Sequence, residues 1–372
     1  MFNKIKLLSL LICFMLTKIA FAEMTLSGYQ EFTMGSADQS LFKGSANHGL
    51  DKAGLDNGQY TRIDAQYTSK LDNGLDITGS LNVSNRDCAG DLVDNCEVTN
   101  MNFVTISGNF GSISVGERFA AGAMMLSRMT ASGPTAEPDG ALYTSFYSAD
   151  DDNTYGGANE VNYAANNMKV LYASNVISGF SFAASYTPNS SRTGLSSTNN
   201  GQQTTGSTWS SYNDLLSVFG KYSMEMDGIG LELVYGQQTG NAGQVGVNAF
   251  NDLDETAYSA KVTYGNFAVD YRKNEAGNSG QIKNNNAGGD EGTSICGEYG
   301  MGNMRFNACQ VETSFTDTSN QTNSSETTTY AADYSLGGGV TLGLVYFDVE
   351  QVANGADRTD VDGLMSILMI GF

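Results

Sequence analysis

The stretch LDITGSLNV at residues 75–83 alternates apolar or small side chains with polar ones, residue by residue. Successive side chains of a β-strand point to opposite faces, so this pattern predicts a strand with one apolar and one polar face. The stretch TAYSAKVTY at residues 256–264 shows the same alternation. Segments of about ten residues with this pattern recur along the chain between tight turns and longer polar loops, which is typical of a membrane β-barrel.

Turn residues divide the chain into sixteen predicted strands. Short turns rich in residues that tolerate positive φ lie at residues 71–74, 108–111, 226–228, 265–266, 302–303 and 337–339. The predicted strands lie near residues 24–34, 59–71, 75–86, 98–107, 112–118, 160–174, 180–188, 212–224, 229–239, 255–264, 267–274, 293–301, 304–315, 327–336, 340–350 and 361–372. An even number of strands, with tight turns at one end and long loops at the other, is typical of an antiparallel barrel. We therefore predict an all-β fold, a 16-stranded antiparallel transmembrane β-barrel.

The placement of charges separates a membrane barrel from a soluble β-sandwich. Most charged residues in the predicted strands fall on the polar face, among them Arg62, Lys169 and Lys261. The apolar face carries four charges, each toward the long-loop end of its strand: Glu117, Asp214, Glu312 and Asp348. A Lys or Arg that faces lipid at the bilayer midplane costs about 2–4 kcal/mol, and less near the interface. This distribution is therefore the one that a lipid-facing surface would impose.

The first 22 residues have the pattern of a secretory signal peptide. Lys4 and Lys6 precede an apolar run at residues 7–16, and Ala20 and Ala22 form a small-x-small cleavage site. The run is shorter than the roughly 20 residues of a transmembrane helix. We expect residues 1–22 to be a signal peptide and residues 23–372 to form the barrel.

Four cysteines remain after removal of the signal peptide, in a chain that is exported to an oxidising compartment. Cys88 and Cys96 flank a short loop, and Cys296 and Cys309 lie symmetrically about the turn at residues 302–303. These spacings predict the disulfides 88–96 and 296–309. A four-thiolate zinc site is the alternative, but neither pair has the spacing of two to four residues typical of such sites.

The composition excludes several classes of protein. Acidic residues number 40 against 19 Lys and Arg, a net charge of −21, which argues against binding nucleic acid through its phosphates. Because His48 is the one histidine, the chain cannot form a His-rich metal site or a two-histidine catalytic scheme. We expect no enzyme, no metal site and no nucleic-acid partner.

Several short motifs resemble the Gram-negative general porin family. They are the segment ISGNFGSISVGER at residues 106–118, the segment SGFSF at residues 178–182 and the opening LSG at residues 26–28. In their order and spacing they cover the whole mature chain. The end of the chain, with Leu364, Leu368 and Ile370 alternating toward a terminal Phe372, resembles the signal recognised by the outer-membrane barrel assembly machinery; Ser366 departs from that pattern.

The resemblance implies an outer-membrane location, a homotrimer and a third long loop that folds into the barrel, here residues 119–159, with a short helix near residues 121–129. In such porins, acids of the inward loop face basic residues on the wall and form a channel constriction. The implied acidic side is Glu137, Asp139, Asp150, Asp151 and Asp152. The implied basic side is Arg62, Arg86, Arg118 and Lys169.

We therefore expect a water-filled channel for passive diffusion of small hydrophilic solutes and ions. Removal of Lys4, Lys6 and Lys18 with the signal peptide takes the net charge from −21 to −24, which favours weak cation selectivity. The alternatives are a channel specific for a sugar, phosphate or peptide and a secreted adhesin. No cofactor is expected. A Ca²⁺ ion at residues 150–152 stays open as an alternative, but a solvated acidic turn is favoured because no calcium-loop spacing is present.

Overall fold

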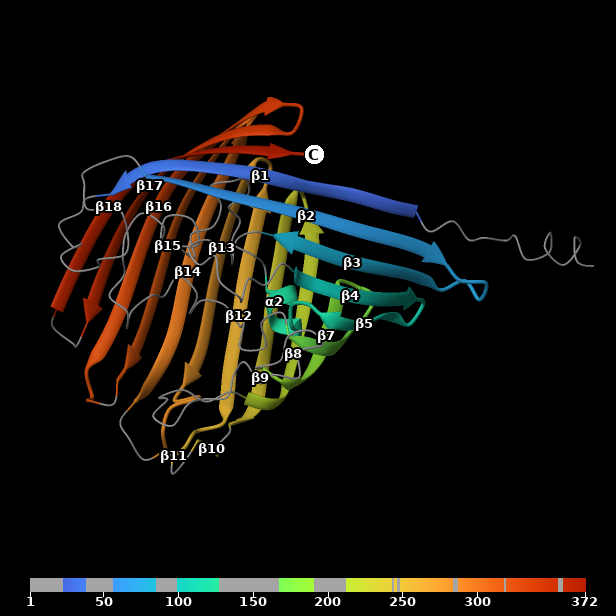
Figure 1. Ribbon diagram of the computed structural model, residues 1–372, viewed down its shortest axis with the longest axis horizontal. Helices are drawn as coiled ribbons and strands as arrows, with labels where there is room; N and C mark the ends of the chain where they lie inside the picture. The colour runs from blue at the N-terminus through green and yellow to red at the C-terminus, as the bar shows by residue number, and fades with distance from the viewer. Residues whose placement is uncertain are drawn as a thin grey trace, which may run out of the picture.

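A computed structural model of the chain shows sixteen strands in one closed antiparallel sheet (Figure 1). The structure describes residues 23–37, 56–84, 99–126, 167–190, 212–242, 244–245, 248–283, 287–317, 319–353 and 357–372. Strands that follow one another in the chain are neighbours in the barrel, β9 pairs with β12, and β1 pairs with β18 to close the ring. The prediction of a 16-stranded antiparallel barrel is confirmed. The predicted signal peptide lies outside the described residues.

The barrel strands are β1 (Glu23–Ala37), β2 (Asp56–Lys70), β3 (Asp76–Ser84), β4 (Thr99–Gly108), β5 (Gly111–Glu117), β6 (Met168–Ala173), β7 (Phe180–Asn189), β8 (Tyr212–Met226), β9 (Ile229–Ala242), β12 (Leu253–Tyr264), β13 (Phe267–Gly277), β14 (Gly288–Met301), β15 (Met304–Thr316), β16 (Thr322–Gly337), β17 (Val340–Ala353) and β18 (Asp357–Gly371). The short strands β10 (Gln244–Val245) and β11 (Asn248–Ala249) form a separate two-stranded sheet. One short helix, α2 (Ala121–Met125), follows β5, and no helix among the described residues is long and apolar enough to cross a membrane.

The strand predicted at residues 160–174 is wrong in its extent. Asn167 is not part of a strand, β6 spans only Met168–Ala173, and residues 160–166 lie outside the described part of the chain. The ammonium group of Lys169 donates hydrogen bonds to the backbone carbonyls of Asn167 and Arg118. These contacts join the chain just after β5 to the chain just before β6. The β5–β6 ladder ends there, at the pair Glu117 and Met168.

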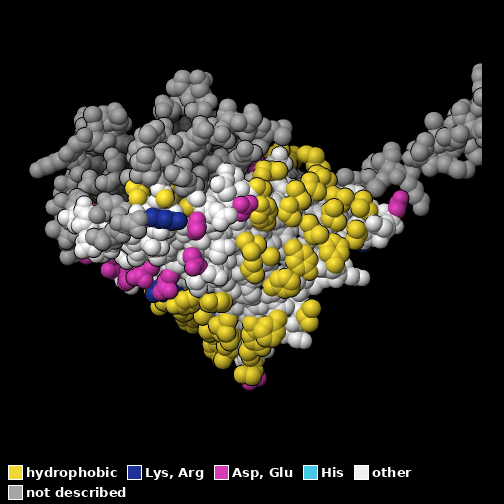
Figure 2. Space-filling view, turned by 90° about the horizontal axis from the view of Figure 1, so that it is seen from below, with side chains coloured by type: hydrophobic (Ala, Val, Ile, Leu, Met, Phe, Trp, Pro, Cys, Tyr) yellow, Lys and Arg dark blue, Asp and Glu magenta, His cyan; other side chains and the backbone are white. Residues whose placement is uncertain are grey.

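The two faces of the barrel differ as the alternation predicts. On β17, Leu342 and Leu344 point outward and are exposed, whereas Gly343 and Val345 point inward and are buried. Broad areas of the outer surface are covered by hydrophobic side chains, with acidic side chains along the border of one such area (Figure 2). An apolar exterior of this kind suits contact with the hydrocarbon of a bilayer.

The prediction of only four charges on the outward face is wrong. Lys273, Glu350 and Asp362 lie at the outward parity within the predicted strands, and other charges lie where the strands extend beyond the predicted bounds. Beyond the apolar band, β13 to β18 carry a row of outward carboxylates at their loop ends. Direct cross-strand partners in this row are Glu275 with Glu291, Glu312 with Glu326, Glu326 with Glu350, Glu350 with Asp360, and Asp348 with Asp362. The ammonium group of Lys273 lies 2.6 Å from Glu275 and 3.2 Å from Glu291. The row therefore lies where water or lipid head groups, not acyl chains, surround the barrel.

Cys296 on β14 and Cys309 on β15 are direct cross-strand partners on the inner face and form a disulfide, with their Cα atoms 4.2 Å apart. The predicted 296–309 pairing is confirmed, because the turn at residues 302–303 sets the register that places the two residues opposite each other. Cys88 and Cys96 lie outside the described residues.

The barrel closes where β18 meets β1. The amide groups of Gly28 and Phe372 each donate to the carbonyl oxygen of the other at 3.0 Å. Ser366, which interrupts the apolar pattern, donates its hydroxyl to the carbonyl of Met34 at 3.0 Å. The predicted assembly-signal residues all fall on the outward face, on β18 or directly after it. They are Leu364, Leu368, Ile370 and Phe372. Their role in assembly stays a prediction.

Candidate functional site in the barrel interior

The chain turns into the barrel directly after β5, where Arg118 holds it in place. One guanidinium nitrogen of Arg118 donates to the hydroxyl of Ser114 at 2.5 Å, and another lies 3.2 Å from the sulfur of Met124. The guanidinium carbon lies 4.6 Å from the centre of the Phe103 ring, within the range of a cation–π contact. Arg118 therefore ties the start of the third loop to the inner wall formed by β4 and β5.

Two serine hydroxyl groups on β7 and β8 hold the helix α2 against the inner wall. The backbone amide of Ala121 donates to the hydroxyl of Ser185 on β7, and that of Gly122 donates to the hydroxyl of Ser217 on β8, both at 3.0 Å. Ser185 and Ser217 are buried side chains of the inward parity. These bonds satisfy amide donors that the first turn of a helix otherwise leaves without a partner.

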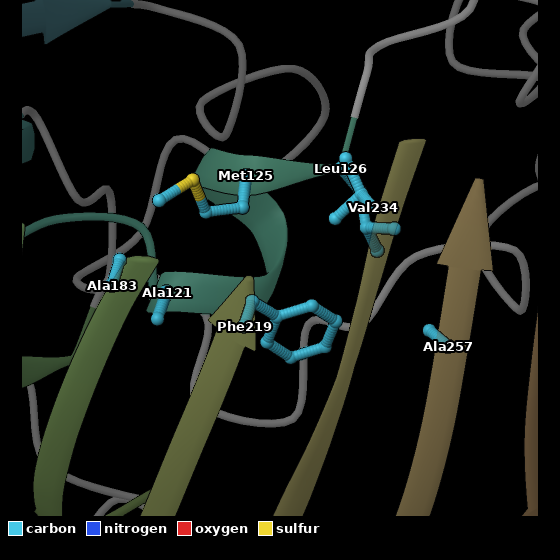
Figure 3. Close-up of a cluster of buried hydrophobic side chains, with 7 residues drawn as sticks. All are labelled: Ala121, Met125, Leu126, Ala183, Phe219, Val234 and Ala257. Atoms are coloured by element: carbon cyan, nitrogen blue, oxygen red, sulfur yellow. The ribbon is translucent and has the colours of Figure 1, made fainter. Parts of the chain in front are cut away.

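Apolar packing completes the attachment of α2 to the wall (Figure 3). Ala121, Met125 and Leu126 form a buried cluster with one side chain from each of four neighbouring strands. These wall residues are Ala183 on β7, Phe219 on β8, Val234 on β9 and Ala257 on β12. The chain from Arg118 to Leu126 thus lies inside the barrel. The helix ends at Met125, earlier than the predicted residue 129, and the rest of the predicted loop lies outside the described residues.

Two of the four predicted basic residues come together at the base of this loop. Lys169 on β6 is only 2% exposed, points inward and donates to the backbone of Arg118. Arg62 lies on β2 and pairs with Asp64 at 2.9 Å, so a carboxylate offsets its charge. Asn82 also donates to Asp64, at 2.6 Å. The structure therefore groups Arg118 with Lys169 and places Arg62 in a separate ion pair.

The other predicted constriction residues fall on parts of the chain that the structure does not describe. They are Arg86, Glu137, Asp139, Asp150, Asp151 and Asp152. Their roles, and the calcium alternative at residues 150–152, remain predictions. Within the described ranges, no group of three or more His, Cys, Asp or Glu side chains could hold a metal ion.

The inner wall from β8 to β16 carries charges of alternating sign, which we term the charge belt. Its eight inward side chains, four cationic and four anionic, come from seven neighbouring strands; Glu225 and Glu255 share the inward parity but lie nearer the strand ends. The charge belt consists of Lys221 (β8), Glu232 (β9), Lys261 (β12), Asp270 and Arg272 (β13), Glu298 (β14), Arg305 (β15) and Asp333 (β16). Its formal net charge is therefore zero.

Ion pairs and register link the members of the charge belt. Lys221 lies 3.0 Å from Glu232, and Arg305 lies 3.6 Å from Glu298. Lys261 is the direct cross-strand partner of Glu232 on one side and of Asp270 on the other, and Arg305 is that of Asp333. The alternation in the sequence places each of these residues on the inner face, but only the register shows that opposite charges are neighbours. The turns at residues 227–228 and 265–266 are the signal from which that register could have been derived.

A second part of the inner wall is apolar, which the alternation did not predict. Three inward residues of β17 and three of β18 are at most 2% exposed: Val345, Phe347, Val349, Val361, Met365 and Ile367. Both faces of these strands are apolar near the middle. The interior is thus asymmetric, because an apolar patch on β17 and β18 interrupts a wall that carries charged side chains on both sides of it.

Comparison with known proteins agrees with this architecture. The family model of Gram-negative porins matches residues 8–357. No curated protein sequence matches the chain. The structure is similar to the in-vitro folded trimer form of OmpT, an outer membrane protein of Vibrio cholerae, with 13% identity, a TM-score of 0.60, and coverage of 94% of this chain and 99% of that chain.

Two further solved structures are similar to the chain. A mutant of the Rh. blastica porin has 16% identity and a TM-score of 0.55, and an anion-selective porin from Comamonas acidovorans has 16% identity and a TM-score of 0.58. Each alignment covers 94% of this chain and 100% of the other. At these identities, the likeness shows the shared fold.

Proposed function

This chain belongs to the Gram-negative porin family, and we propose that it forms a water-filled channel through which small hydrophilic solutes and ions diffuse passively, with a weak preference for cations. The protein is an outer-membrane β-barrel. One observation carries the proposal: the closed barrel has an apolar exterior and charged side chains on its inner wall. Eight strands already suffice to fill a barrel with side chains, so sixteen leave room for water.

The weak cation preference follows from how the charges are distributed. The charge belt is neutral, and Arg62 is offset by Asp64, so these wall charges give little selectivity. Arg118 and Lys169 attract anions locally, whereas the excess of acids over the whole chain, 40 against 19, attracts cations. Salt limits the reach of each charge to about 8 Å. An ion in the bore is therefore attracted or repelled by the basic residues and by the acidic residues near it, and the two effects oppose each other. The cation preference is therefore small.

Reversal potentials in planar bilayers test this proposal. Across a KCl gradient at low salt, we expect stepwise channel currents and a K⁺ permeability that exceeds the Cl⁻ permeability. At 1 M salt the screening length falls to about 3 Å, so the same ratio should approach one. Absence of channel currents would contradict the channel, and a clear anion preference would contradict the cation selectivity alone.

We further propose a homotrimer that associates through the wall around β2 to β6. β5 has seven residues and β6 has six, whereas a tilted transmembrane strand needs about 9–11. This part of the wall is too short to face hydrocarbon across the full bilayer. Beside this part of the wall, on the outer face, lies a hollow of about 250 Å³. It is lined by Gly79, Met24, Tyr67, Leu81 and Val104, among others. The similar OmpT structure is a trimer form, which supports this assembly.

Photocrosslinking from the outer wall tests the proposed interface. A benzophenone amino acid in place of Leu81, beside the hollow, should yield covalent dimers and trimers after irradiation in the membrane. The matched control replaces Leu342 on β17, which is similarly exposed at 44% against 38% but lies in the long-stranded wall. It should yield crosslinks to lipid only. Equal chain-to-chain crosslinking from both positions would contradict an interface at β2 to β6.

A further inference from the structure

Some charged groups of the charge belt face the lumen without forming an ion pair with another member of the belt. The side chain of Lys261 is partly exposed and, within the described part of the chain, makes no hydrogen bond or ion pair. It stands directly between Glu232 and Asp270 in the register. The side chain of Glu232 is 25% exposed, and one of its carboxylate oxygens contacts Lys221. A cation and a carboxylate with capacity for a further partner therefore lie on adjacent strands.

The spacing of these charges is set by the sheet. Neighbouring strands lie about 4.8 Å apart, so the backbones of Lys261 and Glu232 are separated by roughly one strand spacing and their side chains leave the wall next to each other. The charges of the belt cancel in total, and salt screens them within about 8 Å. An ion in the middle of the bore is therefore acted on weakly. A solute close to the wall meets a positive and a negative group on adjacent strands.

We infer that the charge belt is a binding surface for zwitterionic solutes, whose carboxylate pairs with Lys261 while their ammonium group pairs with Glu232. This inference rests on the proposed channel function and names a solute class for it. A neutral solute of the same size gains neither ion pair. A singly charged solute gains one pair but is repelled by the neighbouring group of its own sign. Zwitterions are thus concentrated at the wall and pass faster.

Liposome swelling with two solutes of the same skeleton tests the inference. The probes are β-alanine, a zwitterion at pH 7, and propionamide, which is neutral. Because a small neutral amide also crosses lipid, each rate is the one that remains after the rate of protein-free liposomes is subtracted. Exposed ion pairs are weak, so we expect β-alanine to enter roughly two- to fivefold faster than propionamide. Lys261→Gln should lower the β-alanine rate to that of propionamide, whereas Lys261→Arg should retain the difference. Lys283→Gln removes the same charge from a loop outside the barrel wall and should leave the ratio unchanged.

The propionamide rate separates the inference from the channel function. If neither solute enters, the proposed channel is wrong. If propionamide enters and β-alanine is no faster, the inference is overturned although the channel stands. Retention of the full β-alanine advantage in Lys261→Gln would also overturn it. Entry of propionamide at the normal rate shows that each variant has folded into an open channel.

Discussion

Replacing Phe219 with alanine is expected to lower the free energy of unfolding by about 3–5 kcal/mol, the usual cost of deleting a buried aromatic ring. The Phe219 ring is 1% exposed and packs with Ala121, Met125 and Val234 where α2 meets the wall. The ring also lies over Gly236, where an added Cβ would meet it at 2.3 Å. No neighbour is therefore placed to fill the cavity. Urea titration of the folded protein in lipid vesicles, with folded and unfolded bands separated by gel migration, measures the loss.

The same substitution should also disturb the channel, because Phe219 supports the segment that enters the lumen. We expect more frequent current fluctuations in single-channel records. The control Phe219→Leu keeps most of the volume and should cost less than about 1.5 kcal/mol, with steady currents. Steady currents in Phe219→Ala, despite the loss of stability, would show that α2 is held by Ser185 and Ser217 without help from the ring.

Leu344→Arg is expected to destabilise the barrel in lipid by about 2–4 kcal/mol, the cost of a lipid-facing Arg near the bilayer midplane. Leu344 is 48% exposed on the outer face and lies between the turn at residues 338–339 and Asp348. The cost arises because the guanidinium must leave water or thin the bilayer to reach it. The urea titration described for Phe219 measures the change.

The inner face of the same strand provides the control. Thr341 points inward near the turn, and Thr341→Arg should change the free energy of unfolding by no more than about 0.5 kcal/mol. Equal losses from both variants would mean that the two faces of β17 meet similar surroundings. That result would contradict a lipid-facing exterior.

The alternation of side chains was sufficient to predict the barrel. A period of two assigns each residue to a face, and glycines in short turns end the strands; Gly74, Gly228 and Gly302 all have positive φ in the structure. Because each tight turn also sets the register of its hairpin, the Cys296–Cys309 disulfide was predictable from the sequence.

The strand ends were less predictable, for a physical reason. β16 begins at Thr322, whereas the sequence predicted its start near residue 327. Its first residues, TNSSET, are polar on both faces because the strand there extends past the apolar band. No alternation marks a strand that is surrounded by polar groups on both sides, so the sequence is indistinguishable from a loop.

For the interior, the sequence predicted which charged residues face inward but not which groups they contact. The sequence placed Arg118, Lys169 and Lys261 on the inner side, but their partners depend on contacts between segments far apart in the chain. Arg118 and Lys169 are joined through a backbone carbonyl, and the hydroxyls of Ser185 and Ser217 hold α2. Ordinary serines in alternating strands carry no mark of that role. Phe219 is likewise indistinguishable in sequence from a lipid-facing aromatic until its parity is known.

The seam between β1 and β18 joins strands that stand at opposite ends of the described chain, with Gly28 bonded to Phe372. β1 can pair with β18 only after the whole chain has been synthesised. Until then the growing sheet has two open edges, which are templates for pairing with other chains. Contacts of such sequence separation also form slowly. The topology therefore leaves the chain most prone to aggregate before its last strand has paired with its first.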